Sequence, residues 1–120
     1  MKILDTNFIC SLFNQLDPNN QKAKDIFFDI DDNEKISVPF IVATELSVSS
    51  NSSKYLSAAK EISSRFIPNN EDDLDYITSL SNSKKHTLKA NDCLIISLCK
   101  RLKAELLTFD KKLGKFVASN

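Results

Sequence analysis

Short runs rich in apolar residues alternate with longer segments of helical periodicity along the whole chain, and this alternation constrains the fold most. Between the runs, apolar residues recur every three to four positions, as in Ala23, Ile26, Phe27 and Ile30. Alternating strands and helices predict a mostly parallel sheet covered by helices. We therefore expect an α/β/α sandwich with a short sheet of four to five strands, built as one domain from residues 1–120. The expected strands are Lys2–Leu4, Ile36–Val38, Arg65–Ile67 and Glu105–Thr108. Asn70 is expected to cap a helix whose apolar stripe contains Leu74, Ile77 and Leu80.

The composition excludes several classes of site. The chain has one glycine, Gly114, which rules out a glycine-rich dinucleotide or phosphate loop and a G-x-S-x-G nucleophile elbow. It has one histidine, His86, which rules out a histidine-based zinc site. The cysteines Cys10, Cys93 and Cys99 form no C-x-x-C pair, so we expect reduced thiols. No apolar run approaches the ~20 residues of a membrane helix, and an acid at position 5 argues against a signal peptide. We expect a cytoplasmic protein.

The net charge of zero hides an asymmetry along the chain. Residues 1–79 carry 7 Lys and Arg against 13 Asp and Glu, whereas residues 80–120 carry 9 against 3. A domain polarised in this way could bind a polyanion through its basic part. The alternative is that these charges scatter over a solvated surface.

Two acids follow predicted strands. Asp5 comes directly after the first strand, and Asp110 comes two residues after the last. The carboxyl ends of parallel strands share one edge of the sheet, and ligands bind there in α/β folds. We therefore expect the two side chains to lie at the same edge. A role in a turn or a helix cap is the simpler alternative for each acid taken alone.

Two further acids lie within apolar stripes of predicted helices. Glu45 shares its stripe with Ile41, Val42 and Val48, and Asp92 precedes Ile95, Ile96 and Cys99 at helical spacing. A position at the edge of the helix is the alternative for Glu45, and a first-turn acid is the alternative for Asp92.

The four acids together suggest more than each does alone. Clustered carboxylates repel one another and lose hydration, which destabilises the fold unless a cation compensates. No Lys or Arg shares these inner stripes, whereas Mg²⁺ or Mn²⁺ prefers oxygen ligands of this kind. Such a site suits metal-assisted hydrolysis, in which an ion activates water and stabilises charge on a phosphodiester.

The segments around these acids resemble the PIN domain family, the nuclease family that contains the VapC toxins. Its opening motif is matched by Ile3-Leu4-Asp5-Thr6-Asn7, and its later acids by Ala43-Thr44-Glu45-Leu46, Asn91-Asp92-Cys93-Leu94-Ile95-Ile96-Ser97 and Leu107-Thr108-Phe109-Asp110-Lys111. The order and the intervals fit across nearly the whole chain.

The resemblance implies a parallel-sheet fold, dependence on Mg²⁺ or Mn²⁺, and cleavage of single-stranded RNA. It assigns the catalytic and metal-binding roles to Asp5, Glu45, Asp92 and Asp110, and supporting polar roles to Thr6, Asn7 and Thr108. It also implies a cognate antitoxin as partner and a homodimer. Lysines that flank the last two acids are candidates for RNA phosphate contacts: Lys84, Lys85, Lys89, Lys111, Lys112 and Lys115.

Other classes of protein also place an acid after the first strand. Haloacid-dehalogenase phosphatases have D-x-D where this chain has Asp5-Thr6-Asn7. Receiver domains need an Asp after the middle strand, where this chain has Pro68-Asn69-Asn70. A third alternative is a PIN-like module that binds RNA or protein without catalysis, although all four acids are present.

Overall fold

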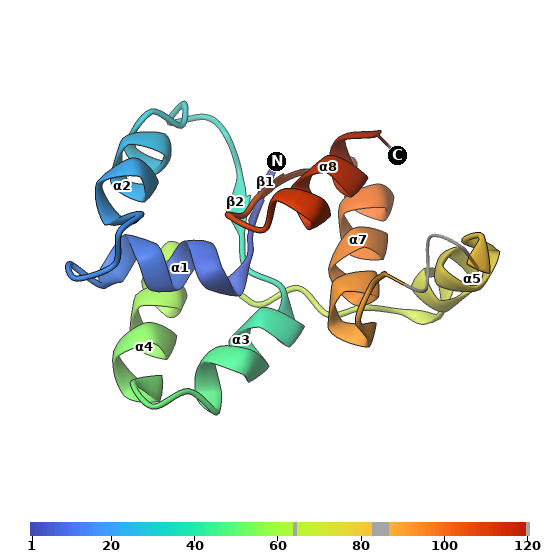
Figure 1. The fold of residues 1–120 in the computed structure, drawn as a ribbon, viewed down its shortest axis with the longest axis horizontal. Helices are drawn as coiled ribbons and strands as arrows, with labels where there is room; N and C mark the ends of the chain where they lie inside the picture. The colour runs from blue at the N-terminus through green and yellow to red at the C-terminus, as the bar shows by residue number, and fades with distance from the viewer. Residues whose placement is uncertain (64, 83–86, 120) are drawn as a thin grey trace.

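The computed structural model describes residues 1–63, 65–82 and 87–119 (Figure 1). Its strands are β1 (Lys2–Leu4), β2 (Ile36–Ser37) and β3 (Glu105–Leu107). Its helices are α1 (Thr6–Phe13), α2 (Asn20–Phe28), α3 (Phe40–Ser47), α4 (Ser52–Ile62), α5 (Glu71–Ser79), α7 (Ala90–Leu102) and α8 (Lys111–Ser119). Within the described ranges, strands and helices follow the predicted order. The α/β class is confirmed.

The sheet is parallel, in the order β2-β1-β3. Lys2 pairs with Ile36 on one side of β1 and with Glu105 on the other. Three strands form over the described part of the chain, so the expected four to five is too many.

The predicted strand Arg65–Ile67 contributes only an isolated parallel bridge between Pro39 and Ile67. The Phe40 N–H donates to the Ile67 carbonyl at 2.8 Å, and the Ile67 N–H donates to the Val38 carbonyl at 3.0 Å. Pro39 is itself one residue of this bridge, and Pro68 directly follows the other. A proline has no N–H to donate, so the ladder does not extend into a strand.

Helix α5 begins where the sequence predicts, but it is rotated about its axis, so that a face other than the predicted one points toward the core. The Asn70 side chain accepts from the Asp73 N–H, and the Asp73 side chain accepts from the Asn70 N–H, which completes a capping box. Leu74, expected in the apolar stripe of this helix, is 58% exposed, and that expectation was wrong. Asp73 faces inward instead and is only 2% exposed, because Arg101 on α7 binds its carboxylate.

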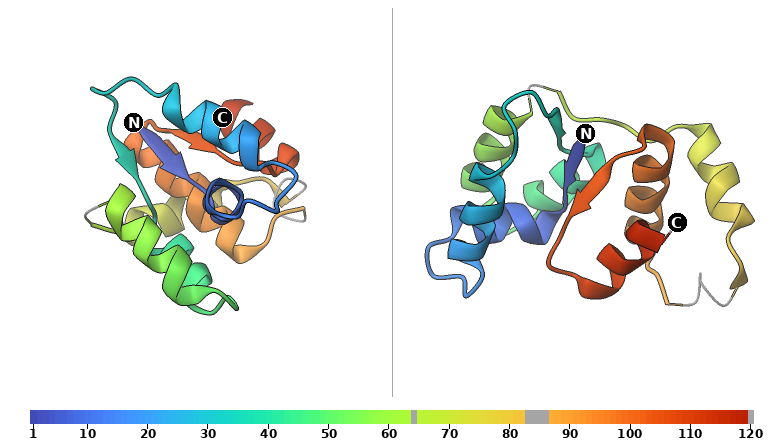
Figure 2. Two further views of the ribbon diagram at one scale, coloured as in Figure 1. Left: turned by 90° about the vertical axis from the view of Figure 1, so that its left-hand side faces the viewer. Right: turned by 90° about the horizontal axis from the view of Figure 1, so that it is seen from above.

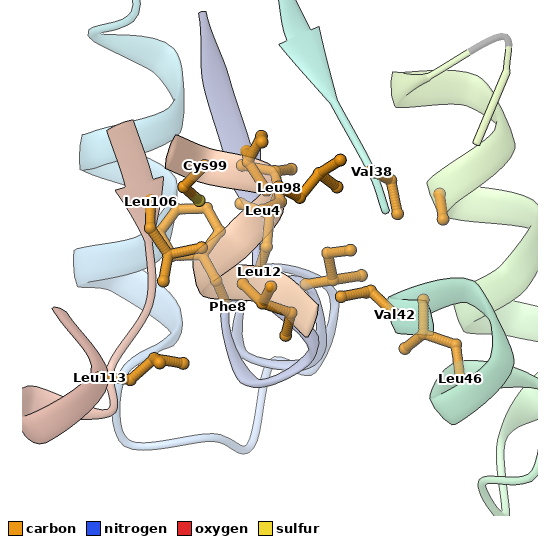
Figure 3. Close-up of a cluster of buried hydrophobic side chains, with 14 of the residues drawn as sticks. Leu4, Phe8, Leu12, Val38, Val42, Leu46, Leu98, Cys99, Leu106 and Leu113 are labelled. Carbon is orange, nitrogen blue, oxygen red and sulfur yellow. The ribbon is translucent and has the colours of Figure 1, made fainter. Parts of the chain in front are cut away.

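The hydrophobic core surrounds the central strand. Ile3 and Leu4 of β1 are fully buried. Side chains from α1, α3 and α7 pack around them (Figure 3). Phe8 on α1 is buried and stacks on Phe109, with the ring centroids 5.5 Å apart. The core therefore fixes the carboxyl end of β1 relative to the segment that follows β3.

Helices flank the sheet. The left view of Figure 2 shows α2 on one side of the strands and α4 and α7 on the other, and α8 packs against both β3 and α7. Helix α5 packs against α7 at the periphery of the molecule (Figure 1). No disulfide joins Cys10, Cys93 and Cys99, all of which lie in the described part of the chain. In the described part of the chain, no helix combines the length and the apolar character needed to cross a membrane.

Candidate functional site

Asp5 and Asp110 lie at the carboxyl edge of the sheet, where strand polarity places them. Asp5 follows β1 and is 6% exposed. It caps α1, since the Thr6 N–H donates to its Oδ1 at 2.8 Å. Asp110 follows β3 and is exposed. The Leu113 N–H donates to its Oδ1 at 3.0 Å, so Asp110 caps the first turn of α8.

A polar network ties Asp5 to the segment after β3. The Thr108 hydroxyl donates to Asp5 Oδ2 at 2.7 Å, and the Asn7 amide donates to the same oxygen at 3.3 Å. The Phe109 N–H donates to Asn7 Oδ1 at 2.9 Å, and the Asp110 N–H donates to Thr108 Oγ1 at 3.0 Å. These bonds fix the orientation of the Asp5 carboxylate and the path of the chain into Asp110.

Glu45 reaches the same region from the middle of α3. It is half-buried, and the Thr6 hydroxyl donates to its Oε1 at 3.1 Å. Thr6 therefore contacts two of the acids, one through its backbone N–H and one through its hydroxyl. Of the four acids, Asp5 is the most deeply buried.

Asp92 lies in the first turn of α7, as one of the two interpretations of its position predicted. Its Oδ2 accepts from the Lys89 N–H at 3.4 Å, and the side chain is half-buried. Three of the four acids thus satisfy backbone donors at the start of a helix. A capping role does not remove the carboxylate from the site, because each oxygen has more than one lone pair.

The four carboxylates interact electrostatically. Burial raises the pKa of Asp5 above its ordinary value, and the charges of Asp92 and Asp110 raise it further. Hydrogen bonds from Thr108 and Thr6 oppose that rise.

The pKa of Glu45 is raised as well. Burial is the main cause, the hydrogen bond from Thr6 opposes it, and the charges of Asp5 and Asp92 add to it. Lys89 lowers the pKa of Glu45. Acids distant in sequence therefore share one negatively charged region.

The donor set fits a hard divalent cation. Carboxylate and hydroxyl oxygens of Asp5, Glu45 and Thr6 meet at the sheet edge, and Asp92 and Asp110 add negative charge to it. Across residues 1–63, 65–82 and 87–119, however, no three Asp, Glu, His or Cys side chains lie close enough to surround one ion. A cation here would have fewer than three carboxylate side chains as direct ligands, with water in remaining positions, as Mg²⁺ commonly has.

The candidate RNA-binding lysines differ in their surroundings. Lys84 and Lys85 lie outside the described residues. Lys112 donates from Nζ to the Thr87 carbonyl at 2.8 Å, which ties α8 to the segment before α7. The remaining three, Lys89, Lys111 and Lys115, are exposed.

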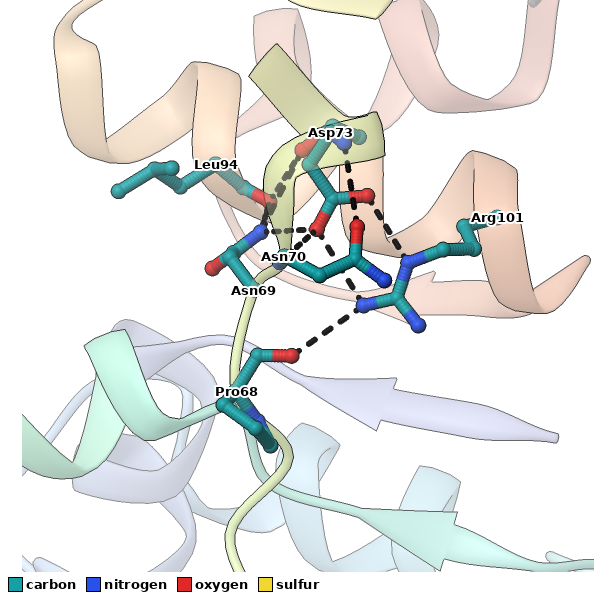
Figure 4. Close-up of polar contacts among 7 residues, drawn as sticks. Pro68, Asn69, Asn70, Asp73, Leu94 and Arg101 are labelled. Carbon is teal, nitrogen blue, oxygen red and sulfur yellow. Dashed lines mark hydrogen bonds and ion pairs between the residues drawn. The ribbon is translucent and has the colours of Figure 1, made fainter.

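One polar cluster was not foreseen from the sequence (Figure 4). Arg101 donates to both carboxylate oxygens of Asp73, from Nε at 2.9 Å and from Nη2 at 3.2 Å. The Asn69 amide donates to Asp73 Oδ2 and to the Leu94 carbonyl, both at 2.9 Å. The only signal in the sequence was the capping pattern from Asn70 to Asp73, which predicts a first-turn acid but not its cationic partner.

Comparison with models of known protein families identifies the family of this chain. The family model described as "PIN domain" matches residues 2–118. The chain belongs to the PIN domain family. Nucleases of this family generally use divalent metal ions. Comparison with curated protein sequences gave no significant match.

Solved structures share the PIN fold with this chain. VapC20 from Mycobacterium tuberculosis, a toxin that cleaves the sarcin–ricin loop, superposes with a TM-score of 0.76 at 15% identity, over 97% of this chain and 95% of that one. FitAcB from Neisseria gonorrhoeae gives 0.71 at 19% identity, over 99% and 94%. VapBC2 from Rickettsia felis, bound to a promoter DNA fragment, gives 0.68 at 19% identity, over 96% and 91%. At these identities the likeness shows the fold alone.

Proposed function

We propose that this PIN domain protein is a metal-dependent endoribonuclease and the toxin of a toxin–antitoxin pair. The observation that carries the proposal is the negative charge that Asp5, Glu45, Asp92 and Asp110 contribute to one region at the carboxyl edge of the sheet. Burial is the main cause of the raised pKa of Asp5 and of Glu45; hydrogen bonds from Thr108 and Thr6 oppose it, and the charges of neighbouring acids act in the same direction as burial. In PIN nucleases a divalent cation is the group that offsets such charge.

The residues divide into three roles under this proposal. Asp5 and Glu45 both contact Thr6 and would hold Mg²⁺ or Mn²⁺. Asp92 and Asp110 would add negative charge close to the bound ion. When bound, such an ion activates water and stabilises negative charge on a phosphodiester.

The second role belongs to Thr108 and Asn7, which fix the rotation of the Asp5 carboxylate through the two bonds to its Oδ2. The third role belongs to Lys89, Lys111 and Lys115. These exposed lysines flank Asp92 and Asp110 in the sequence and would bind RNA phosphates without reading the bases.

Membership of the PIN family and the solved relatives support the toxin assignment. VapC20 is a toxin that cleaves RNA, and the VapBC2 structure was obtained with promoter DNA. By analogy, this chain would pair with an antitoxin, form a homodimer and act in the cytoplasm. A small reading frame for an antitoxin beside the gene, with co-purification of its product, would support the pairing.

RNA cleavage in the presence of Mn²⁺ or Mg²⁺ tests the nuclease assignment. We expect single-stranded RNA to be cut to fragments with 5′-phosphate and 3′-hydroxyl ends, and we expect EDTA to abolish cleavage. Glu45→Gln and Asp92→Asn should each remove most of the activity. Asp75→Asn, at an exposed position on α5, is the matched control and should leave the activity unchanged.

Three results would contradict the assignment. Cleavage that persists in EDTA would exclude a metal-dependent reaction, and a 2′,3′-cyclic phosphate product would show that the RNA 2′-hydroxyl is the nucleophile. RNA binding by the parent protein without cleavage under any metal condition would favour the non-catalytic module.

A further inference from the structure

A hollow of about 270 Å³ lies between α5, α7 and α8. Its floor is apolar and consists of side chains from α7, α8 and the turn before β3: Ile96, Cys99, Val117 and Ala104. The hollow lies toward the far end of α7 from the carboxylates. Asp92 is in the first turn of this helix and Lys103 is its C-cap, which separates them by about 16 Å along the axis. The lining of the hollow shares no residue with the candidate nuclease site.

Three polar side chains border this apolar floor. Tyr76 lines the hollow from α5, and Lys100 and Lys103 line it from the end of α7. Burial raises the pKa of Tyr76, so its hydroxyl stays protonated and can donate a hydrogen bond. The hollow thus combines an aromatic wall, an apolar floor and two cations.

The backbone at Lys103 is unusual. Lys103 has φ 52° and ψ 44°, in the left-handed region, and it is the only non-glycine residue among those described that has a positive φ. Glycine or asparagine is the usual residue at this place after a helix, because a larger side chain is strained there. A strained position that keeps a lysine beside a hollow favours a role for the lysine side chain.

The wall formed by α5 is held rigidly. Asp73 and Arg101 join α5 to α7 through an ion pair whose carboxylate is buried, and Asn69 adds a hydrogen bond to the Leu94 carbonyl of α7 (Figure 4). These contacts set the separation of the two helices at the start of α5, whereas Tyr76 lies one turn further along it. These contacts therefore hold α5 against α7 beside the hollow.

We propose that this hollow binds a nucleotide, with the base against Tyr76 and the apolar floor and the phosphate beside Lys100 and Lys103. An aromatic side chain next to lysines is the combination that proteins use to bind unpaired nucleotides, since every base has a face that stacks and every phosphate attracts a cation. The nucleotide is either free in solution or one unit of an RNA strand. Only the second source rests on the proposed nuclease function.

Calorimetric titration of the full chain with each ribonucleoside 5′-monophosphate, in the presence of EDTA, tests this inference. We expect saturable binding, with inorganic phosphate binding more weakly than any of the four nucleotides. Lys103→Asn should weaken binding about tenfold by removing one charge-assisted contact. Asparagine tolerates the left-handed conformation, so the melting temperature should not fall. Ala104→Leu should abolish binding by filling the hollow, and Lys60→Gln, on the exposed face of α4, should leave binding unchanged.

A single-stranded RNA oligonucleotide, tested with the same variants, identifies the source of the nucleotide. Loss of oligonucleotide binding in Lys103→Asn and Ala104→Leu would support the RNA strand as ligand, and an effect confined to the mononucleotides would support a free nucleotide. The proposal is overturned if phosphate binds as tightly as the nucleotides, if Ala104→Leu binds normally, or if no nucleotide binds. RNA cleavage by the parent with Mn²⁺ is measured separately, so failure of the nuclease assignment and failure of this site give different results.

Discussion

Replacing Arg101 with methionine should strongly destabilise the protein. The change keeps an apolar side chain of similar length but removes both hydrogen bonds to Asp73, which is 2% exposed. Removing one partner of a buried ion pair typically costs about 3–5 kcal/mol, because the remaining charge has no counter-ion. Asp73 keeps donors from Asn69 and Asn70, so we expect a loss of about 3 kcal/mol. For a domain of this size that corresponds to roughly 10 °C in melting temperature.

The loss should depend on pH in a defined direction. Burial acts to raise the pKa of Asp73, but the hydrogen bonds from Arg101, Asn70 and Asn69 outweigh it and hold this pKa below the ordinary value of 3.8. In the parent, the stability that Asp73 contributes is present above pH 3.8 and is lost as the pH falls through the lowered value. Without Arg101 the pKa of Asp73 rises, so the buried carboxyl is neutralised at a higher pH. The difference between parent and variant should therefore shrink on acidification.

Urea unfolding followed by circular dichroism at neutral pH and near pH 4.5 measures both effects. Lys60→Met, which removes an exposed cation from α4, is the control and should change stability by less than about 0.5 kcal/mol. The double variant Asp73→Asn/Arg101→Met should recover most of the loss, because neither charge is left unpaired. A loss below about 1 kcal/mol for Arg101→Met, the range of an exposed ion pair, would refute the reasoning.

Three further predictions concern the candidate nuclease site. Glu45→Gln keeps an oxygen that can accept the hydrogen bond from α1. Because the pKa of Glu45 is raised, its negative charge opposes folding above that pKa. Thermal melts at neutral pH should therefore show that the metal-free variant is as stable as the parent or more stable, by up to ~1 kcal/mol. That gain should vanish below pH 4.5, and the stabilisation by Mn²⁺ should be lost. Thr108→Val removes the 2.7 Å bond to Asp5 and should lower the free energy of unfolding in urea by about 1–2 kcal/mol, whereas Thr108→Ser should not. Lys111→Gln and Lys115→Gln should each reduce the slope of log binding constant against log salt concentration for RNA by about one unit. An unchanged slope would show that these lysines are solvated and do not contact RNA phosphates.

Strand polarity made it predictable that two of the acids lie at the same edge of the sheet. Asp5 and Asp110 each follow a strand, and parallel strands place their carboxyl ends together whatever the details of packing. The start of α5 was predictable for a similar reason, since the capping box from Asn70 to Asp73 involves residues that are neighbours in the sequence. Features set by local chemistry or by chain direction were therefore accessible without a structure.

Features set by contacts between distant segments were not accessible. The rotation of α5 depends on Arg101, which lies 28 residues after Asp73, and apolar periodicity alone placed Leu74 in the core instead. The segment Arg65–Ile67 has strand-like residues, but strand formation also needs a partner that can extend the ladder. The partner segment ends in Pro39, which limits the pairing to one bridge.

The four acids show why the sequence could not separate a cap from a metal ligand. Asp5, Asp92 and Asp110 each accept from a backbone N–H at the start of a helix. The positive end of a helix dipole stabilises a carboxylate placed there, so these acids tolerate close approach even without a cation. Glu45 lies inside α3, away from the positive end of that helix, and accepts a hydrogen bond from the Thr6 hydroxyl. A capping role therefore explains the position of three acids but not of Glu45, which makes the charge of Glu45 the most direct test of a cation at this edge.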